Sequence, residues 1–302
     1  PPFSAVPNLI QSLPLDLAQR TALETAVNSH DYARAEAVLA EAIVQHPKSP
    51  QLLAFVGAIS FLNGNYLNAA IAMKKAEALR PLANRDRFTL AMAYLALERP
   101  DWARPELDKL ALSGEKNPLY PYWLSRLDYR DMNFESALTN ARRAIEVDPG
   151  FVKGYDNLGL TYEAIGKTEE AIKAYQQAVN FNRGKNPPSP WPAMNLGALL
   201  VKLGRCEESE APLRESLSYD PRFPQAHFQL GLAFEKESKF SDAIRELEQA
   251  SSFDPNYAEP HFALGRIYKR LGEREKAERA FATFRDIKEQ QSRAAKLRKQ
   301  SR

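Results

Sequence analysis

Residues 152–185 read VKGYDNLGLTYEAIGKTEEAIKAYQQAVNFNRGK, and this stretch decides the fold because its pattern recurs along the chain. The alanine at position 171 belongs to a series with a spacing of 34 residues: Ala35, Ala69, Ala103, Ala137 and Ala171, resuming at Ala243 and Ala277. A second series places a proline near the end of most segments, at Pro47, Pro81, Pro149, Pro221 and Pro255. An internal period of this length indicates stacked supersecondary repeats rather than one globular core.

Within each repeat, the sequence predicts two helices joined by a tight turn. In the quoted stretch, Tyr155, Leu158 and Tyr162 are spaced by three and four residues, which places them on one face of a helix. Glycine at position 15 of a repeat is expected to end the first helix, and it occurs at Gly64, Gly166, Gly204 and Gly272. Asp-Pro pairs at 148–149, 220–221 and 254–255 are expected to end the second helix, because the residue before proline disfavours helical geometry.

Eight repeats follow from this register, starting at residues 16, 50, 84, 118, 152, 190, 224 and 258. Four inserted residues, 186–189, precede the sixth repeat, and this proline-rich link predicts a wider gap in the stack. A small residue at position 8, such as Gly159, is expected to let paired helices approach closely, while large residues at positions 7, 11 and 24 fill the space between pairs. Residues 1–15 contain four prolines and predict an extended arm, from which Phe3, Val6, Leu9 and Ile10 cover the first repeat.

The pattern resembles the tetratricopeptide repeat (TPR) family over about residues 16–291, whose period is 34 residues. The resemblance implies an all-α fold, a right-handed TPR superhelix (α-solenoid) of eight helix-turn-helix repeats in residues 16–284. Residues 285–302 are expected to continue the last helix as a basic cap that covers the final apolar face. The resemblance also implies a concave groove lined by the first helices, with positions 2, 5, 6, 9, 12 and 13 facing it.

Those inward positions predict a peptide-binding site. Position 6 supplies the amides of Asn157, Asn195 and Gln229, which can both donate to and accept from a peptide backbone. The other candidate peptide-binding residues are the aromatic Tyr122, Trp191, Phe228 and Phe262 and the cationic Arg126, Arg130 and Lys153. The inward positions of repeats four to eight carry eight cations against four carboxylates, which predicts an acidic segment or a C-terminal carboxylate as ligand.

No pattern in the sequence indicates catalysis, a metal or a cofactor. The four histidines, His30, His46, His227 and His261, lack the paired helical spacing of a metal site, and no glycine-rich phosphate loop occurs. The single cysteine, Cys206, occupies a position where other repeats carry aromatic residues and is interpreted as a small buried hydrophobe. The net charge is +3, with seven Lys or Arg against two acids in residues 285–302, a run interpreted as a solvated helix face rather than a nucleic-acid site.

The sequence therefore predicts a non-catalytic scaffold that binds an extended, acidic peptide segment of a protein partner in its groove. The alternative is a regulatory or substrate-presenting arm of a larger enzyme such as a glycosyltransferase, and a third interpretation, a helical-repeat RNA binder, is disfavoured because no repeat position carries matched base-reading residues. No apolar run reaches the length of a membrane span, so no membrane insertion is expected. The chain begins Pro1-Pro2, which is compatible with a removed signal peptide, a lost domain or a cloning boundary, and the oligomeric state stays open.

Overall fold

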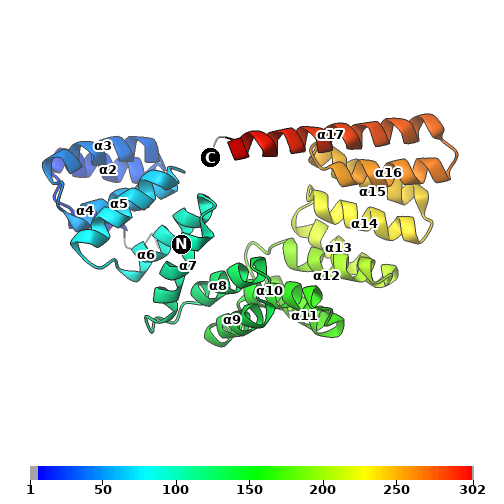
Figure 1. Cartoon of the computed structure of the whole chain (residues 1–302), viewed down its shortest axis with the longest axis horizontal. Helices are drawn as coiled ribbons and strands as arrows, with labels where there is room; N and C mark the ends of the chain where they lie inside the picture. Colours follow the sequence, from blue (N-terminus) through cyan, green and yellow to red (C-terminus); the bar gives the residue numbers. More distant parts are fainter. Residues whose placement is uncertain (1–5, 301–302) are drawn as a thin grey trace. The chain divides into compact units, whose positions relative to one another are not determined.

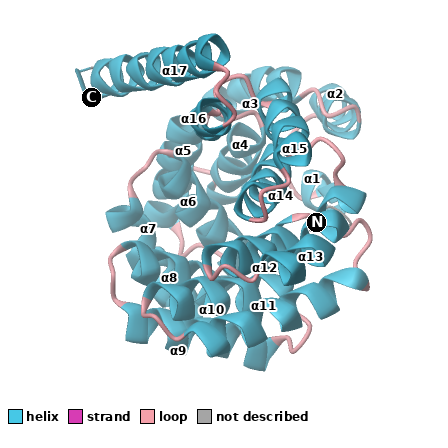
Figure 2. Ribbon diagram, turned by 90° about the vertical axis from the view of Figure 1, so that its right-hand side faces the viewer, coloured by secondary structure: helices cyan, strands magenta, loops and turns pink. Residues whose placement is uncertain are grey.

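The structure is a computed structural model that describes residues 6–300, and every regular element in that range is a helix (Figures 1 and 2). The all-α repeat architecture is thereby confirmed. The chain divides into two compact units, an N-terminal unit, Pro1–Asn140, and a C-terminal unit, Ala141–Arg302. The boundary between them falls inside helix α9 (Phe134–Val147).

The N-terminal unit begins with a short helix and continues as pairs of helices. Its helices before α9 are α1 (Val6–Gln11), α2 (Leu17–Asn28), α3 (Tyr32–Gln45), α4 (Pro50–Leu62), α5 (Tyr66–Leu79), α6 (Asn84–Ala96), α7 (Pro100–Ala111) and α8 (Leu119–Arg130).

The C-terminal unit continues the same alternation. After α9 it contains α10 (Val152–Ala164), α11 (Thr168–Arg183), α12 (Trp191–Lys202), α13 (Cys206–Tyr219), α14 (Pro224–Lys236), α15 (Phe240–Phe253), α16 (Ala258–Arg270) and α17 (Arg274–Gln300). The first helix of each of the eight pairs starts within one residue of the repeat start that the sequence predicts.

Close approach of paired helices depends on the small residue at position 8. A Cβ atom added to Gly159 of α10 would lie 2.5 Å from the ring of Tyr175 in α11, which is closer than any real contact of this kind. The same conflict recurs one pair later, where a Cβ on Gly197 would lie 2.5 Å from Leu213. The close approach at position 8 is as the sequence predicts, whereas the large residue at position 24 packs on position 8 within the pair rather than between pairs.

The turn inside every pair contains one residue in the left-handed backbone region. Glycine fills this position in four repeats, with φ between +75° at Gly166 and +81° at Gly272. In the other four repeats the same position holds His30, Glu98, Met132 and Ser238, with φ from 56° to 61°. Each of these side chains costs free energy that glycine avoids, because an L-residue is crowded in this region.

The predicted extended arm is wrong over residues 6–11, which form α1. Apolar residues at Leu9, Ile10 and Leu13 recur at helical spacing, and a helix lets them pack on the first pair together with Leu15. Ile10 is 1% exposed and lies in one cluster with Leu23 of α2, so this segment covers the first apolar edge. Phe3 lies outside the described residues.

The predicted gap at the 186–189 insertion is also wrong, because α11 and α12 pack directly through Ile172, Val179, Leu196 and Leu200. Helix α11 absorbs part of the extra length by continuing to Arg183. The side chain of Asn182 then holds the loop: its Nδ2 donates to the Ser189 carbonyl at 2.7 Å, and its Oδ1 accepts from the Ser189 N–H at 2.9 Å.

Helix α17 is the longest helix of the described residues, with 27 residues, and it combines the second helix of repeat eight with the predicted cap. Ile287 is 8% exposed, and Gln291 Nε2 donates to the Asn256 carbonyl at 2.8 Å, so contact with α16 and its leading loop extends to this point. Residues 292–297 are all exposed, and the helix projects beyond the start of α16 (Figure 1).

Candidate functional site

The first helices of the C-terminal unit form one continuous surface, here called the first-helix face. Helix α12 contacts both α10 and α14, and α14 also contacts α16, so four first helices lie side by side. Position 6 of successive helices in this row carries Asn157, Asn195 and Gln229. The regular spacing of the repeat therefore aligns these amides across the row, as the sequence predicts.

The three amides differ in accessibility. Asn157 is 2% exposed and is part of the packed interior of the face rather than its surface. Asn195 is half-buried, and its Nδ2 donates to Oδ1 of Asp156 at 2.8 Å, which leaves its carbonyl oxygen as an acceptor toward a ligand. Gln229 is half-buried as well. Only two of the three predicted amides therefore present a side chain at the surface.

Asn195 and Gln229 open into one hollow of about 320 Å³, here called the amide groove. Its floor is formed by Leu160 of α10, Ala198 of α12 and Leu232 of α14, all at position 9 of their repeats. An apolar floor with two amides on it suits a polypeptide, whose backbone needs hydrogen bonds while its side chains need apolar contact. These apolar residues were not among the predicted site residues, because only the charged residues at position 9 were considered for binding, although all three residues share that position.

The cations on the first-helix face are largely engaged with neighbouring repeats. Lys202 Nζ lies 2.9 Å from Glu163 Oε1, and Arg266 lies 2.6 Å from Glu235 Oε2. Lys236 Nζ donates to the Val201 carbonyl at 2.5 Å. These contacts tie each first helix to the preceding one, so the count of eight cations overstates the positive charge that a ligand meets.

The predicted aromatic residues of the C-terminal unit are partly exposed and stacked on neighbours. Trp191 is 48% exposed, with its ring 4.8 Å from that of Phe223 in an edge-on arrangement. Phe262 is 41% exposed, and Phe228 is half-buried with its ring 5.1 Å from that of Tyr257. Lys153 of α10 is exposed.

The other three predicted residues belong to α8 in the N-terminal unit. Tyr122 is 8% exposed, and Nη1 of the exposed Arg126 donates to its hydroxyl at 3.3 Å. Arg130 makes two hydrogen bonds to Oδ1 of Asp131, at 2.9 and 2.7 Å. Tyr122 therefore contributes to packing, and Arg130 has an acid beside it.

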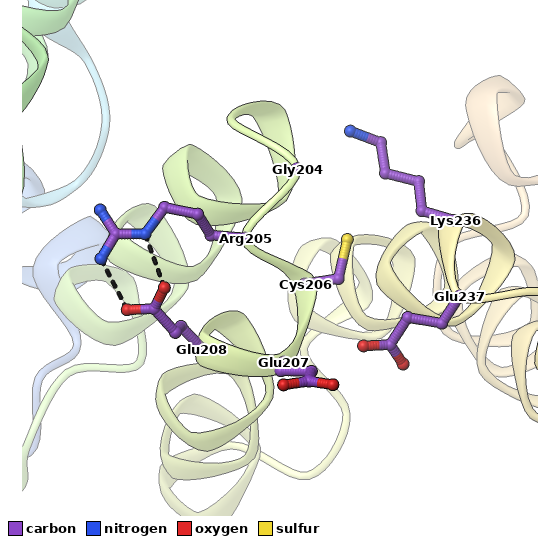
Figure 3. A pocket seen from close by; sticks show the side chains of 7 residues that line it. All are labelled: Gly204, Arg205, Cys206, Glu207, Glu208, Lys236 and Glu237. Atoms are coloured by element: carbon purple, nitrogen blue, oxygen red, sulfur yellow. Dashed lines mark hydrogen bonds and ion pairs between the residues drawn. The ribbon is translucent and has the colours of Figure 1, made fainter.

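A second hollow of about 430 Å³ lies at the turn between α12 and α13 and includes Cys206 (Figure 3). Its rim carries the Arg205–Glu208 ion pair, which has two hydrogen bonds of 2.7 and 2.6 Å. Cys206 is 7% exposed, and burial raises the pKa of its thiol, which disfavours the reactive thiolate. Cys206 therefore packs as a small hydrophobe rather than acting as a nucleophile.

His261 and His227, both at position 4 of their repeats, lie in different environments. Burial lowers the pKa of His261, which favours its neutral form. His227 is 9% exposed and pairs with Glu246. Among residues 6–300, no three His, Cys, Asp or Glu side chains cluster in a way that could hold a metal ion.

Comparison with known proteins identifies the repeat. Three family models, each described as tetratricopeptide repeat, match residues 22–84 and 194–258, residues 152–184, and residues 235–300. Together with the helix pairs and their position-8 contacts, these matches show that the chain belongs to the tetratricopeptide repeat family.

Curated relatives match short segments. The chain is 38% identical over 48 residues to small glutamine-rich tetratricopeptide repeat-containing protein 2 of Saccharomyces cerevisiae, covering 16% of this chain and 14% of that protein. It is 31% identical over 81 residues to TPR repeat-containing protein YpiA of Bacillus subtilis, covering 27% of this chain and 18% of that protein. The chain thus spans less than a fifth of either relative's length in these matches.

Solved structures share the fold. A tetratricopeptide repeat protein from Parabacteroides merdae matches with a TM-score of 0.66 and 15% identity, covering 83% of this chain and 97% of that one. The APC/C hetero-tetramer Cut9–Hcn1 matches with a TM-score of 0.65 and 16% identity, covering 85% of this chain and 50% of that one. PilW, a type IV pilus biogenesis factor, matches with a TM-score of 0.60 and 20% identity over 67% of this chain and 92% of that one.

Among the described helices, none combines the length and the apolar character that crossing a bilayer requires.

Proposed function

We propose that this protein is a non-catalytic scaffold that binds an extended segment of a partner protein on the first-helix face of its C-terminal unit. The observation that carries the proposal is the amide groove, where Asn195 and Gln229 stand over an apolar floor. Amide side chains hydrogen-bond a peptide backbone without reading its sequence, so they suit a surface that takes an extended chain. The TPR fold, whose stacked repeats present such a surface, supports the same function.

The ligand of the amide groove need not be acidic, in contrast to the expectation from the sequence. Lys202 and Arg266 each face a glutamate of the preceding repeat, and Lys236 is bonded to a backbone carbonyl. In the lining of the amide groove, Lys202 is paired with Glu163 and Lys236 keeps its charge, so a ligand meets one uncompensated cation, and its affinity depends on backbone hydrogen bonds and apolar contact more than on acidic side chains.

The test begins with peptides selected from a random library displayed on phage and panned on the intact protein. Their affinities are then measured for Asn195→Ala, for Gln229→Ala and for a matched control, Gln177→Ala, on the exposed surface of α11. Each groove substitution is expected to weaken binding by about 1 kcal/mol, or roughly five-fold, whatever the peptide sequence, because it removes one hydrogen bond to the backbone. The control should bind normally.

Thermal unfolding separates binding from folding. It should be nearly unchanged for Gln229→Ala, whereas Asn195→Ala also removes the hydrogen bond to Asp156 and should lower stability by about 1 kcal/mol. Asn157→Ala is unsuitable as a ligand variant, because at 2% exposure its loss acts on folding. Selected peptides whose affinity is the same in the control and in both groove variants would show that the amide groove is not the binding surface.

A further inference from the structure

A separate pocket lies at the C-terminal end of the first-helix face, here called the aromatic pocket. It has a volume of about 260 Å³ and is lined by Phe228, Leu232, Phe262, Arg266, Phe284 and Lys288, among others. Two of these residues come from α14, two from α16 and two from α17, so the long last helix closes the face on one side.

The aromatic rings of this pocket are held in place but not covered. Phe262 stacks at an angle on Phe281, with ring centres 5.6 Å apart, and on Phe284, with ring centres 5.2 Å apart. Despite these contacts Phe262 keeps 41% of its surface exposed to solvent. A rigid, exposed aromatic ring at the edge of a pocket is the kind of group that carries binding energy at protein interfaces.

The cations that line the pocket are ion-paired, and the excess of positive charge lies further along α17. Lys288 on the pocket wall pairs with Glu259 at 2.6 Å, and Arg266, whose guanidinium lies 5.6 Å from the centre of the Phe262 ring, pairs with Glu235 at 2.6 Å. Beyond the pocket, Arg293 and Lys296 are exposed on the projecting part of α17. Residues 285–302 carry seven Lys or Arg and two acids, a net charge of +5 within one short segment.

We infer that the aromatic pocket and the basic part of α17 together bind an acidic segment of a protein partner that inserts one bulky apolar side chain. The inference rests on the proposed scaffold function and adds the chemistry of the ligand. The pocket supplies the apolar contact, and residues 285–300 of α17, with six Lys or Arg against two acids, supply complementarity to acids flanking the inserted residue. The preference for acidic ligands thus belongs to α17 and not to the amide groove.

The acidic polypeptide is favoured over other anions by the pairing of apolar and charged surfaces. A polyanion bound only by charge would need the basic residues and would be indifferent to Phe262. An amphipathic segment with one aromatic or leucine residue among acids needs both surfaces at once, which is what the pocket and the helix offer.

The test uses a defined probe: a short fluorescein-labelled peptide with one phenylalanine among aspartate, glutamate and glycine residues. Matched probes replace the phenylalanine by alanine, or replace all acids by their amides. With the intact protein, fluorescence anisotropy is expected to show the phenylalanine probe binding about ten-fold tighter than the alanine probe, because one aromatic side chain is buried. The amide probe should bind more weakly than the acidic one and should lose the salt dependence.

Protein variants then separate the two surfaces. Phe262→Ala should abolish the difference between the phenylalanine and alanine probes, whereas Phe262→Leu should keep most of it, which excludes a general folding defect. Phe181→Ala, at another exposed aromatic residue of the same unit, is the matched control and should change nothing. The double variant R293E/K296E should weaken all acidic probes, while K167E/K173E on the exposed surface of α11 and its leading turn should not.

Each other outcome decides against the inference. If Phe262→Ala leaves the phenylalanine preference intact, the aromatic pocket is not the anchor site. If Asn195→Ala weakens the probe while Phe262→Ala does not, the inference fails and the proposed scaffold function stands, and if neither matters both fail. If single-stranded DNA or phosphatidylserine vesicles displace the probe and Phe262 is irrelevant, α17 is a general anion-binding helix.

Discussion

Repeats three and seven place an ion pair at the same two positions but build it from different residues. In repeat three, Arg87 at position 4 of α6 pairs with Glu106 at position 23 of α7. In repeat seven, His227 at position 4 of α14 lies 2.8 Å from Glu246 at position 23 of α15. Both pairs are largely buried and join the two helices of one repeat. The repeat therefore tolerates a charge at this place only when a partner faces it.

The Arg87 pair is part of a wider network. Arg87 also lies 2.8 Å from Glu77 of α5, and Lys74 and Lys109 approach Glu77 and Glu106 from the outside. Burial works against ionisation of Glu77, but hydrogen bonds from Lys74 and Arg87 outweigh it and lower the pKa of this carboxyl. An arginine stays charged at every pH that a folded protein meets, so this network keeps its cation throughout.

The ion pair of His227 with Glu246 exists only while both nitrogens of the imidazole ring are protonated. The Nε2 atom of His227 lies 3.0 Å from the Pro221 carbonyl, which can only accept, and Nδ1 lies 2.8 Å from Glu246. Both ring nitrogens can donate at once only in the imidazolium form. Burial lowers the pKa of His227, but the contacts with Glu246 and the Pro221 carbonyl outweigh it and raise the pKa overall, with a further contribution from Asp220. Arg245, 3.4 Å from Glu246, is the cation on the opposite side of that carboxyl.

The same position of the repeat can therefore carry either a permanent or a pH-dependent ion pair between its two helices, here called a clamp. The geometry is the same, and only the proton affinity of the position-4 side chain differs. Substitutions of this side chain, together with changes of pH, therefore test whether the two ion pairs differ in this way.

The largest effect is expected for Arg87→Met. The substitution leaves Glu77 and Glu106 buried without their shared cation, and loss of one partner of a buried pair costs about 3 kcal/mol of unfolding free energy. Urea unfolding followed by circular dichroism measures the loss. Arg279→Met is the control, since the Arg279 side chain is 75% exposed and pairs with Glu275, which is 91% exposed, and it should change stability by less than about 0.5 kcal/mol. Equal effects of the two substitutions would show that the buried network adds nothing.

The next effect is a pH dependence confined to repeat seven. Because the pKa of His227 is raised, its contribution is complete below the ordinary value of 6.5 and disappears as pH rises through the raised value. Burial opposes ionisation of Glu246, but the hydrogen bond from His227 outweighs it and lowers its pKa, so its contribution is complete above 4.5 and disappears as pH falls through the lowered value. The clamp is therefore strongest between pH 4.5 and 6.5 and weakens in alkaline buffer.

Hydrogen exchange measures this directly, once corrected for the intrinsic pH dependence of amide exchange. Protection of α14 and α15 should fall in alkaline buffer, while α6 and α7 in the same sample keep theirs and serve as the internal control. His227→Arg copies repeat three into repeat seven and should remove the alkaline loss, and Glu246→Gln should reverse its sign because the buried imidazole then favours its neutral form. Parallel loss of protection in both repeats of the unmodified protein would contradict a specific role of His227.

The sequence predicted the repeat well because its evidence is periodic. The close approach at Gly159 follows from the small residue that recurs at position 8. The contact of Gly159 with Tyr175 at position 24 was not predicted, because position 24 was assigned to the space between pairs. The His227–Glu246 pair escaped prediction, because in the other well-formed repeats the same two positions hold apolar residues or unpaired types, as with Tyr155 and Ala174. A pair that occurs in few repeats leaves no periodic signal.

The accessibility of the candidate site residues could not be predicted from the sequence. Asn195 and Gln229 at position 6 line the amide groove, but Asn157 at the same position is buried. Whether a position-6 side chain is covered depends on the size of its neighbours in adjacent repeats, and these vary along the chain. The loop of residues 186–189 was misjudged for a similar reason, since one side chain, Asn182, holds it against the stack.

The smallest effect concerns the turn that repeats three and seven share. Both place a non-glycine residue in the left-handed region at position 15, Glu98 with φ 56° and Ser238 with φ 61°. Glycine removes the crowding of the Cβ atom but adds freedom to the unfolded chain, so Ser238→Gly and Glu98→Gly should each stabilise the protein by only about 0.5 kcal/mol. Gly272→Ser is the reverse experiment at φ +81° and should destabilise by a similar or larger amount. Because serine has no titratable group and Ser238 is not part of the His227 pair, the gain of Ser238→Gly should be independent of pH, measured as the shift in urea midpoint in acidic and alkaline buffer. A gain at Ser238 that varied with pH would instead couple this turn to the His227 clamp and widen the difference between the two repeats.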